Sequence, residues 1–151
     1  MLAAIRLRGK VKVKKDLEYT MELLRLYKVN HLVLVDERLK PMLKKVNAFI
    51  TFGEVRKETL STLLQKRARL EGDKKVSEAF LKEKKLKSFE DLSEKILAKK
   101  ASLKELGIKP VFRLNAARKG LGRLGTKQPF HLGGALGYRA EKINELIERM
   151  M

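Results

Sequence analysis

Two stretches of this chain contain no carboxylate side chain, and this uneven distribution of charge restricts what the chain can fold into. Residues 1–15 carry six Lys or Arg side chains and no Asp or Glu, and residues 106–140 carry seven and again none. The second stretch also holds seven of the ten glycines. A run of charges is usually a solvated surface, but solubility alone does not require the removal of every carboxylate from 35 residues, so the two stretches indicate a surface that meets an anion.

The overall charge indicates a polyanionic partner. The 151 residues carry a formal net charge of +18 and a pI near 10.2, and such a charge opposes compaction unless a polyanion neutralises it. Nucleic acid is the commonest polyanion, and a membrane surface is the rival. The sequence has no apolar run of about 20 residues and no signal-peptide core, so we expect a cytoplasmic protein without a membrane partner. The absence of Cys excludes disulfides and thiol chemistry.

Hydrophobic periodicity in the first third predicts the order β-α-β-α-β. The expected elements are strands at 5–8, 32–35 and 48–52, a helix following Asp16, and a short helix from Pro41 to Val46. In the first strand, Ile5 and Leu7 alternate with Arg6 and Arg8, which is typical of a half-buried strand with a basic face.

The remaining sequence predicts helices, a strand, a long loop and a closing helix within one α+β domain spanning 1–151. The core occupies 1–53, a helical insertion 54–107, and a basic strand-loop-helix segment 108–151. Ser88 begins a capping-box pattern for one insertion helix. Residues 115–138 show little periodicity, so we expect a long basic Gly-rich loop that adds few core residues and is disordered without its partner.

The glycines of this loop match a nucleotide-binding pattern only superficially. Gly120-Leu-Gly122-Arg-Leu-Gly125 has dinucleotide-fingerprint spacing, but Pro129 follows where that fingerprint requires a helix. The same glycines suit close approach of backbone N–H groups to phosphates. An unstructured surface loop is the alternative. We therefore expect no cofactor and no small-molecule substrate.

No arrangement of catalytic residues is apparent. The two histidines are His31, which begins a buried strand and is expected to be structural, and His131, which lies in the basic loop and is suited to contacting a nucleotide. No nucleophile–base–acid set or metal-ligand spacing accompanies them, so we expect neither an enzyme nor a metal site.

The basic and glycine-rich positions are the candidate RNA-binding residues. They are Arg6, Arg8, Lys10, Lys12, Lys14, Arg113, Arg118, Lys119, Gly120, Gly122, Arg123, Lys127, His131, Gly133, Gly134 and Arg139. The alternative is a free-standing basic regulator that binds DNA. It would need a helix presenting base-reading Arg, Asn or Gln, whereas the helices expected here present mostly Lys and Glu.

Several segments resemble one family of large-subunit ribosomal proteins, the L-thirty family. Ile5-Arg-Leu-Arg-Gly9 is similar to its start, and Gly137-Tyr-Arg139 and Ile143-Asn144-Glu-Leu-Ile147 resemble the C-terminal signature of its archaeal and eukaryotic branch, which includes the eukaryotic protein L-seven. The archaeal form fits best, because the long basic N-terminal tail usual in the eukaryotic branch does not precede Ile5. The resemblance implies a ferredoxin-like three-stranded core and a structural role in the cytoplasmic ribosome. It also implies binding to 23S-type ribosomal RNA, a position near the 5S RNA, and neighbouring ribosomal proteins as partners.

Overall fold

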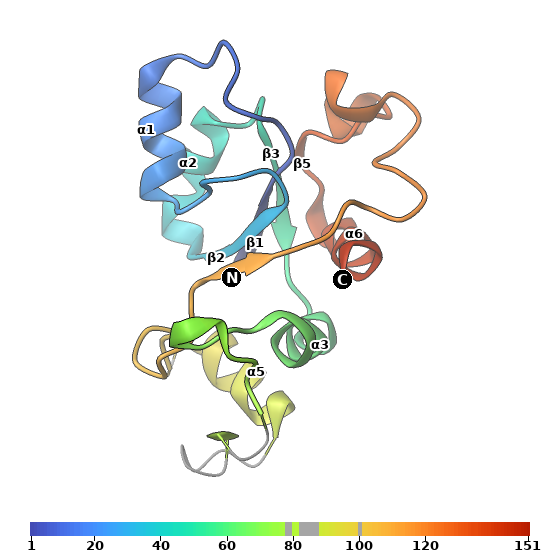
Figure 1. Ribbon diagram of the computed structural model, residues 1–151. Helices are drawn as coiled ribbons and strands as arrows, with labels where there is room; N and C mark the ends of the chain where they lie inside the picture. The colour runs from blue at the N-terminus through green and yellow to red at the C-terminus, as the bar shows by residue number, and fades with distance from the viewer. Residues whose placement is uncertain (78–79, 82–87, 100) are drawn as a thin grey trace.

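The computed structural model describes residues 1–77, 80–81, 88–99 and 101–151 and has an α+β fold built on one sheet (Figure 1). The strands are β1 (Leu2–Arg6), β2 (His31–Val35), β3 (Ile50–Glu54), β4 (Val111–Arg113) and β5 (Gly137–Tyr138). Their order across the sheet is β4-β2-β1-β3-β5. β1 is antiparallel to both of its neighbours, β4 is antiparallel to β2, and β5 is parallel to β3. The sheet therefore combines the first third of the chain with its last third.

The helices cover this sheet on both sides. They are α1 (Lys15–Leu23), α2 (Lys40–Lys45), α3 (Lys57–Arg67), α5 (Phe89–Leu97) and α6 (Ile143–Met150). In Figure 1, α1 and α2 lie on one side of the sheet and α6 on the other, with α3 and α5 below. The expected α+β class, the β-α-β-α-β order and the C-terminal helix are confirmed. A second insertion helix, expected around 76–81, falls partly outside the described residues.

The strand β1 is buried on both faces, which corrects the expectation of a half-buried strand. Because side chains alternate along a strand, Leu2 and Ala4 pack into a cluster with α1 and α2, whereas Ala3 and Ile5 pack into a second cluster with α3, α5 and α6. The second cluster takes residues from the insertion as well as from the sheet. Because helices pack against both faces of the sheet, neither face of this central strand is exposed to solvent.

Arg6 lies in the interior and is not part of a basic surface. Its side chain has no exposed area, and its guanidinium donates hydrogen bonds to the carbonyl oxygens of Leu26 at 2.8 Å and Arg8 at 2.8 Å. Burial lowers the pKa of Arg6 from its usual value. The residue thus joins β1 to the segment that follows α1, which corrects the expectation of an exposed basic strand face, while a contact between Arg6 and RNA stays a prediction.

The expected loop at 115–138 is more ordered than its sequence suggests. It contains the 3₁₀ turns Gly125–Lys127 and Phe130–Leu132 and leads into β5. Ala135 and Leu136 are its buried residues in the second cluster, which agrees with the expectation that this segment adds few core residues. Hydrophobic periodicity did not reveal these two residues, because turns place them in the core and neither lies in a regular helix or a long strand.

Arg139 fastens the end of this segment to the sheet. Only 5% of its surface is exposed, and its guanidinium donates to the Thr51 hydroxyl at 3.2 Å and to the Ala135 carbonyl at 3.0 Å. It also lies 4.3 Å from the centre of the Phe130 ring. Burial lowers the pKa of Arg139 to about 10, so the side chain remains charged at neutral pH. Like Arg6, it is an interior residue, which corrects its assignment to the RNA-binding surface.

Candidate nucleic-acid interface

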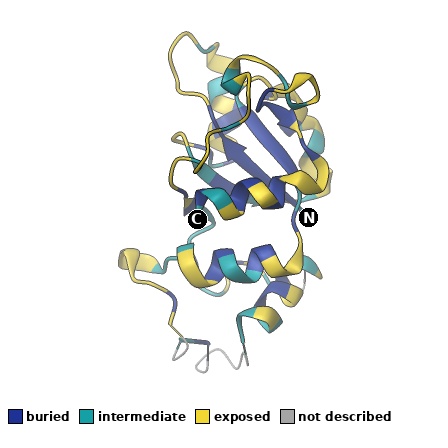
Figure 2. Ribbon diagram, turned by 90° about the vertical axis from the view of Figure 1, so that its right-hand side faces the viewer, coloured by how far each residue is buried: buried dark blue, intermediate teal, exposed yellow. Residues whose placement is uncertain are grey.

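The strand registers bring the two acid-free stretches to the same end of the sheet. At this end β1 finishes with Arg6, β2 begins with His31 and β3 begins with Ile50. β4 finishes there with Arg113, opposite His31, and β5 begins beside Thr51. We call this the basic end of the sheet. In Figure 2 the strands are buried, whereas the loops above them are largely exposed.

Residues 47–49 lie between the two stretches. The amides of Leu7 and Arg8 donate to the carbonyl of Phe49, and the Arg8 guanidinium donates to the Ala48 carbonyl at 3.2 Å. On the other side, Gly137 approaches Asn47 so closely that an added Cβ would lie 2.7 Å from the Asn47 amide oxygen. Stretches separated by about a hundred positions therefore share one platform.

Most of the candidate cations at this interface are exposed and have no acidic partner. Among the described residues, the exposed Lys and Arg candidates with no carboxylate within ion-pair distance are Arg8, Lys12, Lys14, Arg118, Lys119, Arg123 and Lys127. Two other candidates are paired: Lys10 contacts Glu18 at 2.8 Å, and Arg113 contacts Asp73 at 3.3 Å. The Glu18 hydrogen bond raises the pKa of Lys10. The unpaired cations are thus free to meet an external anion.

Local backbone conformation explains why glycines gather in this segment. Gly122 has φ +121°, a value that L side chains rarely adopt. Gly134 is different: it is buried, and an added Cβ would lie 2.0 Å from the Gln128 carbonyl oxygen. Gly120 and Gly133 are exposed. Gly134 therefore closes the segment on itself and is a structural residue rather than a surface contact.

The two histidines have different surroundings. His131 is exposed in the turn Phe130–Leu132, next to the unpaired cations in sequence. His31 is partly buried at the start of β2. Burial lowers the pKa of His31, and the positive charges of Arg113, Lys28 and Arg6 lower it further. These cations surround a point where the first and last thirds of the chain meet.

Tyr27 and Lys28 were not among the residues predicted from the sequence. They line a pocket of about 400 Å³ at the basic end, together with Val29 and residues of the first acid-free stretch. Tyr27 is 46% exposed in the segment that joins α1 to β2. The available signal was an aromatic residue beside a lysine, twelve positions after the end of the first acid-free stretch.

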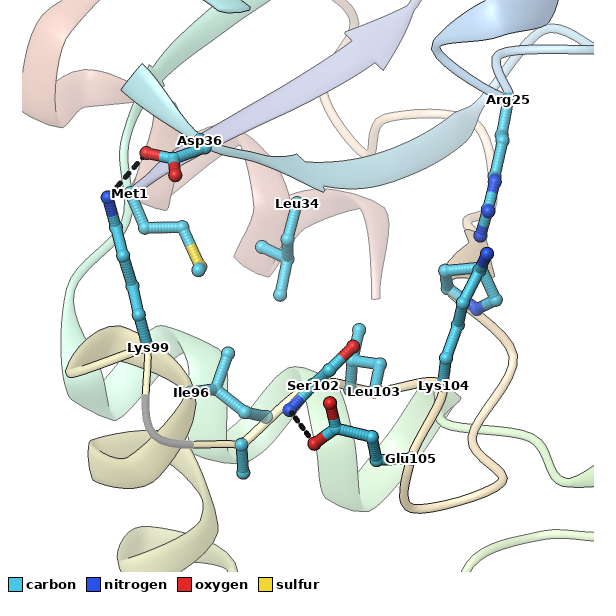
Figure 3. Close-up of a pocket in the computed structure, with 12 residues that line it drawn as sticks. Met1, Arg25, Leu34, Asp36, Ile96, Lys99, Ser102, Leu103, Lys104 and Glu105 are labelled. Carbon is cyan, nitrogen blue, oxygen red and sulfur yellow. Dashed lines mark hydrogen bonds and ion pairs between the residues drawn. The ribbon is translucent and has the colours of Figure 1, made fainter. Parts of the chain in front are cut away.

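The opposite end of the sheet carries a second pocket of different character (Figure 3). It has a volume of about 390 Å³, and the side chains of Leu34, Ile96 and Leu103 line it. Its rim carries both acidic and basic side chains, including an ion pair between Lys99 and Asp36 at 2.6 Å. In the part of the chain that the structure describes, no three His, Cys, Asp or Glu residues are grouped to hold a metal ion. None of the helices described there has the length and apolarity needed to cross a membrane.

The known proteins to which this chain is similar share one family name. No family model matches the chain. The large ribosomal subunit protein uL30 of Methanococcus maripaludis is 47% identical over 151 residues, covering 99% of this chain and 98% of the relative. The uL30 protein of Nanoarchaeum equitans is 46% identical, covering 99% and 97%. That of Staphylothermus marinus is 44% identical, covering 100% and 98%. The chain therefore belongs to the uL30 family of large ribosomal subunit proteins, whose role in the ribosome is structural and not enzymatic.

Proposed function

We propose that this chain binds large-subunit ribosomal RNA, mainly through backbone phosphates at the basic end of its sheet. The observation that carries the proposal is the set of seven exposed cations without a carboxylate partner, all from two stretches that the fold brings to one end. Neutralising phosphates with Lys and Arg releases condensed counterions, which is the main source of affinity in such complexes. The RNA is of the 23S type, with the 5S RNA as a further candidate, and the remaining surface meets neighbouring ribosomal proteins.

The fold supports this proposal by fixing where the charges stand. Arg8 is held by its hydrogen bond to the Ala48 carbonyl and lies 5.9 Å from the centre of the Phe49 ring. The segment that carries Arg118 and Arg123 is anchored by the amide of Arg118, which donates to the carbonyl of Arg149 at 3.0 Å. Cations held on a packed scaffold lose less conformational freedom on binding than cations on a free tail.

The first prediction concerns the salt dependence of binding. If about seven phosphates are neutralised, the logarithm of the affinity should fall against the logarithm of salt concentration with a slope of roughly −5 to −6. A fluorescence titration of the full chain with deproteinised archaeal large-subunit RNA, repeated across salt concentrations, measures this slope. A slope near zero would contradict binding through phosphates.

The alternative function, a regulator that reads DNA sequence, makes a different prediction in the same assay. A sequence-reading protein concentrates discrimination in a few side chains that contact base edges. We expect the chain to prefer the ribosomal RNA to a DNA duplex of equal length, with no strong preference among duplex sequences. Tight binding to one particular duplex would favour the regulator.

A further inference from the structure

The pocket beside Tyr27 has features that phosphate contacts alone do not explain. Its volume of about 400 Å³ lies within the range of roughly 300–1,000 Å³ typical of small-ligand sites. Its walls are formed by Arg6, Gly9, Lys10, Tyr27, Lys28 and Val29. Tyr27 and Val29 are 46% and 43% exposed, so an aromatic and an aliphatic side chain both stand open to solvent inside a basic surface.

The positive charge in the wall of this pocket favours an occupant that carries a negative charge. Lys10 and Lys28 stand in its wall, and no carboxylate does. Glu18 and Glu22 lie nearby but are engaged with Lys10 at 2.8 Å and 3.5 Å. Lys28, by contrast, has no carboxylate within ion-pair distance among the described residues, so an apolar protein side chain would leave its charge without a partner. A nucleotide carries both a flat apolar ring and an adjacent phosphate, so it matches both parts of the wall.

A buried polar group in the wall gives independent support. Arg6 is fully buried, and its Nη1 and Nε atoms donate to backbone carbonyls, but its Nη2 atom has no hydrogen-bond partner among the described residues. A buried donor without a partner costs free energy, so such groups in native proteins usually have an explanation. The ring nitrogens and carbonyl oxygens of a nucleobase are acceptors that can supply the missing partner after a small adjustment of the side chain.

We propose that this pocket receives a nucleobase unstacked from the RNA, which lies against Tyr27 while Lys28 faces a flanking phosphate. The inference rests on the proposed function and deepens it, because it assigns one position of the interface to recognition of a base. Sequence-specific recognition of RNA uses unpaired bases that stack on aromatic side chains. The site therefore marks a bulge or loop, and not a continuous helix, as the RNA element at this point.

The test compares variants of the full chain in the titration with deproteinised archaeal large-subunit RNA. Tyr27→Ala should weaken binding about 5- to 150-fold, the range for loss of one stacked base. The salt slope should not change, because tyrosine carries no charge. Tyr27→Phe should keep the parental affinity, since the ring is retained. The matched control is Tyr19→Ala, which removes a tyrosine that is 63% exposed and does not line the pocket.

A spectroscopic measurement separates stacking from loss of packing. Tyr27→Trp makes the only Trp in the chain, and RNA should quench its emission. The corresponding Tyr19→Trp protein should show little quenching. Parental binding with the expected salt slope, but equal affinities for the parent and Tyr27→Ala, would overturn the base pocket and leave the proposed function intact. A parent that does not bind RNA would instead contradict the proposed function itself. Quenching of Tyr19→Trp but not of Tyr27→Trp would also overturn the pocket.

Discussion

Replacing four cations of the 118–127 segment together should weaken RNA binding far more than any single replacement. The variant carries Arg118→Ala, Lys119→Ala, Arg123→Ala and Lys127→Ala, all at exposed positions without a carboxylate partner in the described part of the chain. Removing one phosphate-binding side chain should flatten the salt slope by about one unit, so the quadruple variant should flatten it by about three to four units. The affinity should fall by roughly 10²- to 10³-fold near physiological salt. Each single variant should lose affinity only modestly.

The control for this experiment removes the same charge from another surface. Lys66, Lys74, Lys95 and Lys104 are exposed in the helical insertion and belong to neither acid-free stretch. Replacing these four by alanine lowers the net charge equally but should leave the salt slope nearly unchanged. Equal losses for the two quadruple variants would indicate attraction by overall charge and would contradict a defined interface.

Gly134→Val should cause a large loss of stability in the basic segment. The new Cβ would lie 2.0 Å from the Gln128 carbonyl oxygen and 2.8 Å from the Gln128 Cβ, so the backbone itself must move. Overpacking against backbone is expected to lower the free energy of unfolding by about 3 kcal/mol. For a chain of this size, that corresponds to a decrease in Tm of about 6–12 °C. Thermal unfolding followed by circular dichroism measures the change.

Gly9→Val is the matched control for stability. A Cβ at Gly9 would meet nothing within 4 Å, and its φ lies outside the left-handed region. We expect its free energy of unfolding to stay within about 0.5 kcal/mol of the parent. If the two variants unfolded at the same temperature, the close packing of residues 128–136 would be disproved.

Local pattern predicted the order of the elements in the first third, but it placed two strands at 5–8 and 48–52 that lie at Leu2–Arg6 and Ile50–Glu54, and it missed the long-range pairing. The continuous apolar run at 32–35 became β2, and Pro41 lies in the first turn of α2, as its missing N–H and fixed φ favour. β5 shows no local signal because it has only two residues and exists through its pairing with Thr51 and Phe52. Such pairing depends on residues more than eighty positions apart, which hydrophobic periodicity cannot detect.

At the candidate interface too, local sequence pattern predicted part of the structure and long-range contacts decided the rest. Charge patterning indicated both stretches, and the exposed cations remain the proposed contacts. It could not distinguish these from Arg6 and Arg139, because a guanidinium becomes an interior group only when backbone carbonyls from distant segments surround it. For Arg6 the acceptor is Leu26, and for Arg139 the ring of Phe130 adds to the environment. Counting basic residues therefore overstates the charge available to an RNA.

The two clusters on opposite faces of the sheet have a consequence for synthesis of the chain. The buried residues of the α1 and α2 side all lie within positions 2–52, so that face can be covered early. The other cluster includes residues up to Met150 and is completed only when α6 emerges from the translating ribosome. At about 5–20 residues per second, making the last hundred residues takes roughly 5–20 s. During that interval the second face of the sheet lacks part of its apolar cover, so we expect the nascent chain to need shielding from aggregation until α6 is made.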